Sequence, residues 1–214
     1  MISNNAKKVP AAKIAYWYFR LNGFLSIENF VLHPDDKKES QRTEADFCGV
    51  RFQYHTELDM EDDAFFKGNR KSPLFVVAEI TRAVCKLNGP WTNPDRRNIQ
   101  YVLGSIGAFP PSEHEALAQS LYKYCTYPEP DKVQEVGFQL VAVGKTANED
   151  LRKEFPRLLQ IELAHILGFI YRRFDAYRGK KADHSQWDQF GQVLWDASEK
   201  EDEPAFVKKF IEQI

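Results

Sequence analysis

The segment at residues 74–81 constrains the fold most, because apolar side chains occupy both faces of an extended chain there. Alternation along a strand puts Phe75, Val77 and Glu79 on one face, while every position on the other face up to Ile80 is apolar. A strand with two apolar faces is typical of a sheet covered on both sides. Glu79 is therefore expected near the end of a buried strand, where an ionised carboxylate costs free energy unless it has a partner or a chemical role.

A second strand-like segment, at residues 44–52, carries another acid. Its alternation places Asp46 on one face together with Glu44 and Cys48. Because opposed side chains on adjacent strands lie close together, we expect the carboxylates of Asp46 and Glu79 to meet at one site. Glu44 fits either an accessory acid of that site or a salt bridge at its rim.

The rest of the pattern predicts a layered fold. The expected elements are a helix at 11–21, strands at 24–32 and 134–143, and a helix reaching Ile106 that is N-capped by Asn93. Ser112 and Glu115 form a capping box for the helix that follows. Helix, three strands, helices and strand, in that order, indicate an α/β protein whose central mixed sheet is flanked by helices.

The last third of the chain is expected to be mainly helical. A short strand at 158–163 leads into a long helix ending near Tyr177, and two further helices close the chain. We expect one domain over 1–214, with a core at 10–147 and a helical C-terminal extension at 158–214. A basic cluster lies at the end of the long helix, and it consists of Arg172, Arg173, Arg178, Lys180 and Lys181.

Composition excludes several classes of protein. The 214 residues are 43% hydrophobic and 28% charged, with a formal net charge of -2, which is typical of an ordinary globular chain and gives no sign of general nucleic-acid affinity. No stretch has the length of a membrane span or the pattern of a signal peptide, so no membrane partner is expected. The three cysteines are far apart and the five histidines are scattered, which predicts a reducing cytoplasmic location and no zinc site.

The order of elements, with Asp46 on the second strand and Glu79-Ile80-Thr81 ending the third, resembles the PD-(D/E)XK nuclease superfamily, which has the restriction-endonuclease-like fold. The resemblance covers roughly the first two thirds of the chain. It implies that Asp46, Glu79 and the Ile80 carbonyl bind Mg²⁺ or Mn²⁺, and that the substrate is a DNA phosphodiester. In that superfamily a lysine two residues after the glutamate helps to activate water, whereas this chain has Thr81 there.

The missing lysine leaves two classes of function open. In a magnesium-dependent endonuclease, Lys86 is the candidate substitute, because it follows the strand and its long side chain can reach back. Arg51 and Arg82 have the wrong strand parity for that role. In the alternative, the chain is an inactive member of the fold that binds DNA or a protein partner, or forms a homodimer. In either class the basic cluster at 172–181 is a candidate contact for DNA phosphates.

Overall fold

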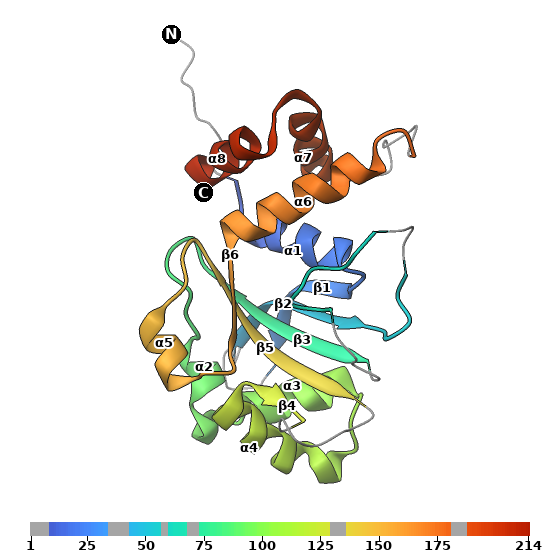
Figure 1. Ribbon diagram of the computed structural model, residues 1–214. Coiled ribbons are helices and arrows are strands. Elements are labelled where there is room, and N and C mark those ends of the chain that lie inside the picture. The colour runs from blue at the N-terminus through green and yellow to red at the C-terminus, as the bar shows by residue number, and fades with distance from the viewer. Residues whose placement is uncertain (1–8, 34–42, 57–59, 68–72, 129–135, 181–187) are drawn as a thin grey trace.

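The computed structural model describes residues 9–33, 43–56, 60–67, 73–128, 136–180 and 188–214. Over these residues the chain is α+β, with one mixed sheet between two layers of helices (Figure 1). The strands are β1 Leu25–Leu32, β2 Thr43–Arg51, β3 Leu74–Ile80, β4 Thr126–Tyr127, β5 Gly137–Gly144 and β6 Leu159–Glu162. The expected central mixed sheet flanked by helices is thus confirmed.

The sheet has the order β1-β2-β3-β5-β4, and β6 also pairs with β5. The first three strands form an antiparallel meander, while β5 runs parallel to both β3 and β6. Every residue of β5 is buried, and β3 is buried on both faces except at Phe75 and Ile80, which are half-buried. The apolar pattern at 74–81 therefore predicted a central strand correctly.

One helical layer packs on one face of the sheet, at the top of Figure 1. It consists of α1 Ala11–Leu21, α6 Leu163–Tyr177, α7 Gln189–Lys200 and α8 Glu203–Gln213. Trp17 of α1 meets Phe174 of α6 edge to face, with ring centroids 6.3 Å apart. The C-terminal helices therefore share one hydrophobic core with the N-terminal helix, and β6 joins the same sheet.

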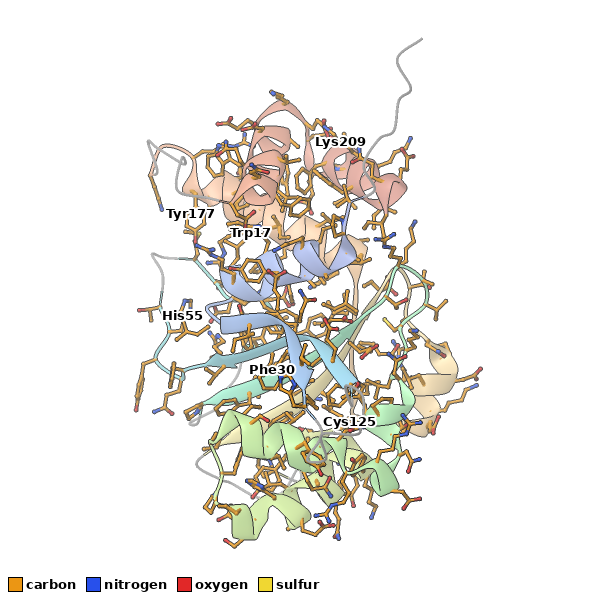
Figure 2. All side chains as sticks on the ribbon, turned by 180° about the vertical axis from the view of Figure 1, so that it is seen from behind. Trp17, Phe30, His55, Cys125, Tyr177 and Lys209 are labelled. Carbon is orange, nitrogen blue, oxygen red and sulfur yellow. The ribbon has the colours of Figure 1, made fainter. Side chains whose placement is uncertain are left out.

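The other layer covers the opposite face and also has a continuous core. It consists of α2 Gly89–Thr92, α3 Asn98–Ile106, α4 His114–Tyr124, α5 Glu149–Glu154, and the 3-10 turns Pro94–Arg96 and Pro111–Glu113. Val77 of β3 packs in this layer with Leu103 and Leu121. Figure 2 shows Trp17 and Tyr177 in the first layer and Cys125 in the second.

Several expected element boundaries were wrong. The helix expected from Pro94 is broken at Arg97, whose left-handed φ of 54° ends a 3-10 turn before α3 begins. Asn93 caps only that short turn, accepting a hydrogen bond from the Asp95 amide at 3.0 Å. The capping box at Ser112 does not form, because the helix starts at His114 after a further 3-10 turn. The short elements α2, β4 and α5 were not predicted.

Among the described residues, no helix combines the length and the apolar character that crossing a bilayer requires.

Candidate functional site

The two acids lie where the ladder between β2 and β3 ends. The antiparallel pairs run from Arg51↔Leu74 to Phe47↔Ala78. Continuing that register by one residue places Asp46 opposite Glu79. An acid on each strand therefore stands at the first position beyond the paired region, where side chains of neighbouring strands approach each other.

The neighbouring strand β1 is distorted at the same level. Residues on either side of Asn29 pair with β2, but Asn29 and the opposite residue, Asp46, are not paired. Asn29 has a left-handed φ of 51°. Asparagine tolerates the left-handed region better than most residues, because its short polar side chain can bond locally. Across this distortion Phe47 packs in the core below α1, whereas Ala45 packs in the core of the opposite layer. The pleat thus turns at Asp46.

Asp46 is directed at the backbone of β3. Its Oδ2 accepts a hydrogen bond from the Ile80 amide at 2.7 Å. The Ile80 amide lies beyond the last β2–β3 pair, so the Asp46 side chain takes the place of a backbone acceptor on β2. Burial raises the pKa of Asp46, the hydrogen bond from Ile80 opposes that rise, and the nearby charge of Glu44 adds to it. The net pKa lies above the usual value, so the surroundings of Asp46 disfavour its negative charge.

Glu79 is more deeply buried, with 7% of its surface exposed. Trp91 Nε1 donates to Glu79 Oε2 at 2.8 Å, and the Asn88 side-chain amide donates to Oε1. Burial raises the pKa of Glu79 to about 7, with a further rise from the charge of Asp46, against the opposing hydrogen bonds and the charge of Lys86. Glu79 therefore exchanges its proton near neutral pH.

The other residues of the predicted site differ in where they lie. Lys86 is exposed, and its charge lowers the pKa of both acids, so its ammonium is close enough to act on each. Thr81 Oγ1 accepts a hydrogen bond from the Ala83 amide at 3.2 Å and helps to turn the chain after β3. Arg51 donates to the Asn22 carbonyl and to Asp62, and Arg82 is exposed.

The oxygen atoms at this point fit a hard cation. No described residue donates to Asp46 Oδ1, and each Glu79 oxygen accepts one donor and retains a second lone pair. The N–H and C=O of one strand residue point to the same neighbouring strand, so the Ile80 carbonyl faces the Asp46 side. Over the described residues no group of three or more His, Cys, Asp or Glu side chains is placed to hold a metal. An ion here would rely on two carboxylates, one carbonyl and water, a set that Mg²⁺ accepts.

The basic cluster at the end of α6 is largely engaged within the protein. Arg172 bonds to Glu203, and Arg178 bonds to the Ser198 carbonyl. Arg173 is only 3% exposed, so its guanidinium cannot reach a DNA backbone in this conformation. Lys180 is exposed, whereas Lys181 lies outside the described residues. Among the described members of this cluster, only the Lys180 side chain forms no hydrogen bond or ion pair within the protein.

Sequence reasoning missed the residues that hold Glu79. Asn88 and Trp91 follow it by 9 and 12 positions. An amide and an indole N–H shortly after a buried acid were the available signal, but only the fold of α2 shows that both point back to it. A second polar pair, Asp63 and His165, is 102 residues apart in sequence and had no local signal.

In comparisons with known proteins, no family model, no curated protein and no solved structure matches this chain. The candidate site consists of two neighbouring acids, one adjacent lysine and a backbone carbonyl at the end of two central strands.

Proposed function

We propose that this chain is a metal-dependent DNA endonuclease of the PD-(D/E)XK type, with Asp46 and Glu79 as the metal ligands. The single observation that supports the proposal is that these two acids follow the last pair of the β2–β3 ladder and interact electrostatically, with Lys86 acting on both. The antiparallel meander β1–β3 followed by parallel β5 supports a restriction-endonuclease-like core.

Mg²⁺ or Mn²⁺ bound here would polarise a phosphoryl oxygen and acidify a water molecule. The chain itself would orient the ion through Asp46, which the Ile80 amide fixes, and through Glu79, which Trp91 and Asn88 fix. Lys86 would place positive charge beside the reacting phosphate in the role of the missing motif lysine. Removing one preorganised contact of that kind costs on the order of 10²-fold in rate.

A second candidate function is an inactive nuclease-fold protein that binds DNA or a protein partner. It is favoured by the two donors on Glu79, which satisfy the carboxylate without a metal, and by Thr81, whose hydroxyl belongs to a turn. A buried carboxylate that accepts two hydrogen bonds already has the partners that burial requires, so it can have a structural role without a metal.

Plasmid nicking with Mg²⁺ separates the two candidates. We expect wild-type protein to nick, Lys86→Ala to lose about 10²-fold in rate, and Thr81→Lys added to Lys86→Ala to restore part of it. Lys208→Ala removes an exposed cation of α8 as a matched control and should nick like wild type. EDTA and Asp46→Asn should abolish nicking.

Calorimetry supports that assay with a readout that needs no turnover. Mg²⁺ or Mn²⁺ should bind wild-type protein and bind Asp46→Asn and Glu79→Gln at least tenfold more weakly. Metal binding that is unchanged in both variants would show that Asp46 and Glu79 are not the metal ligands. Metal binding by wild-type protein without nicking by wild type or any variant would favour the inactive relative.

A further inference from the structure

A cavity of about 480 Å³ lies in the helical layer that contains α1 and α6, between the loop at residues 60–64 and one face of α6. The loop is held to the end of α1, because the Asp63 amide donates to Asn22 Oδ1 at 2.9 Å. Asp63, His165, Arg172 and Arg173 bring titratable and charged groups to its wall. None of these residues belongs to the site at Asp46 and Glu79.

Arg173 is the unusual member of this wall. It is 3% exposed, its Nη2 donates to the Glu61 carbonyl at 2.9 Å, and its guanidinium lies 5.1 Å from the centroid of the Phe169 ring. Its Nη1 is buried and has no hydrogen-bond partner. Among the described residues no carboxylate forms an ion pair with Arg173. A buried guanidinium with an orphan donor and no counter-charge is destabilising by itself.

The acids around the cavity do not provide that counter-charge, because each has its own cation. Glu61 is bonded to Lys67, and Asp62 is bonded to Arg51. Asp63 Oδ2 lies 2.7 Å from His165 Nε2. Burial would raise the pKa of Asp63, but hydrogen bonds from His165 and the Phe65 amide outweigh it and hold the pKa below the usual value. Asp63 therefore stays ionised and fixes the imidazole.

Two arginine side chains line this cavity. Arg172 is exposed at the rim, and one bond to Glu203 leaves its other guanidinium N–H groups for a ligand. The His165 side chain is 39% exposed, and no described residue bonds to its Nδ1. Arg173 and Arg172 are thus two guanidinium groups on the wall of one cavity, and guanidinium groups pair well with the terminal oxygens of a phosphate monoester.

We propose that this cavity binds the phosphate group of a small organic phosphate, with the buried Arg173 as its principal partner. A phosphate would satisfy the orphan Nη1 and neutralise the buried charge at the same time. The volume of about 480 Å³ lies in the range of pockets that hold small organic molecules and far exceeds the space of one anion. The proposal is independent of the metal site, because the cavity lies beside α6 and shares no residue with the ends of β2 and β3.

Titration calorimetry tests this on the full chain in EDTA, with inorganic phosphate, AMP and adenosine as probes. We expect wild-type protein to bind AMP more tightly than inorganic phosphate and not to bind adenosine. Arg173→Met keeps an apolar stem beside Phe169, and it should abolish AMP binding while thermal unfolding shows that it folds. Arg172→Gln should weaken binding roughly tenfold.

Two matched variants keep the result interpretable. Arg157→Gln removes an exposed cation that packs on Tyr124 in the opposite layer, and Asp46→Asn alters the proposed metal site. Both should bind AMP like wild type. Absence of phosphate binding in wild type, equal binding of adenosine and AMP, or unchanged binding in a folded Arg173→Met would each overturn the proposal.

Discussion

The raised pKa of Glu79 makes the stability of the protein depend on pH in a defined way. The pKa is about 7 in the folded chain against 4.5 for an ordinary glutamate. The folded state therefore holds this proton more tightly than the unfolded state, and protonation of Glu79 favours folding. That contribution is complete below pH 4.5 and is lost as the pH rises through 7.

The magnitude follows from the size of the shift. A difference of about 2.5 pKa units, at about 1.36 kcal/mol each, corresponds to roughly 3 kcal/mol over the whole range. Roughly 2 to 3 kcal/mol of this falls between pH 5 and pH 8. Because Glu79 is almost fully buried, solvent screening does not reduce the effect as it would for an exposed carboxylate.

Glu79→Gln isolates the effect in urea unfolding at pH 5 and pH 8. The glutamine amide cannot accept both hydrogen bonds from Trp91 and Asn88, so this variant carries a fixed loss of stability at both pH values. Relative to wild type, however, the variant should gain roughly 2 to 3 kcal/mol on going from pH 5 to pH 8. Glu199→Gln, on an exposed position of α7, should show no such gain. An equal difference between Glu79→Gln and wild type at both pH values would refute the reasoning.

Two further predictions concern the core of the α1–α6 layer. Gly191→Ala would place a Cβ 2.0 Å from the Trp17 ring and should destabilise the protein by about 1–3 kcal/mol in urea unfolding, whereas Gly89→Ala, where the added Cβ meets nothing within 4 Å, should not. Phe19→Ala removes a fully buried ring that stacks on Phe47 with centroids 4.2 Å apart and should cost about 3–5 kcal/mol by the same measurement, and a loss under 1 kcal/mol would mean that this layer repacks freely.

Local patterns in the sequence predicted the elements that are long and strongly periodic. The helix at 11–21 matches α1, and the apolar run at 74–81 matches β3 to within one residue. The predictions failed where the local sequence signal was weak, or where the structure depends on contacts between residues that are distant in sequence. The left-handed position is occupied by Arg97, a residue type that does not usually adopt this conformation, so the sequence did not predict the turn. The helix α5 was also not predicted, although its N-cap Asn148 is followed by two acids.

The site shows the same division. Strand parity predicted that Asp46 and Glu79 would face each other. The β2–β3 ladder ends one residue before them, and the charge of Asp46 raises the pKa of Glu79. Parity could not predict that the pleat turns at Asp46 and that its carboxylate accepts a hydrogen bond from the Ile80 amide, because an alternation rule assumes a regular strand. It also could not predict that Trp91 folds back onto Glu79, since the position of α2 depends on tertiary packing.

A purely structural role explains Glu79 better than it explains the pair. A carboxylate that accepts hydrogen bonds from Trp91 and Asn88 needs no second acid nearby, yet Asp46 stands opposite it and raises its pKa. Asp46 in turn is made harder to ionise by burial and by Glu44, while the cation that acts on both acids, Lys86, is exposed and therefore screened by water. Like charges held together at a strand end, with only a screened cation beside them, create a negative potential that a proton or a divalent ion would relieve. A proton can relieve it only up to about pH 7. The metal site that we propose therefore predicts that affinity for Mg²⁺ increases as Glu79 ionises.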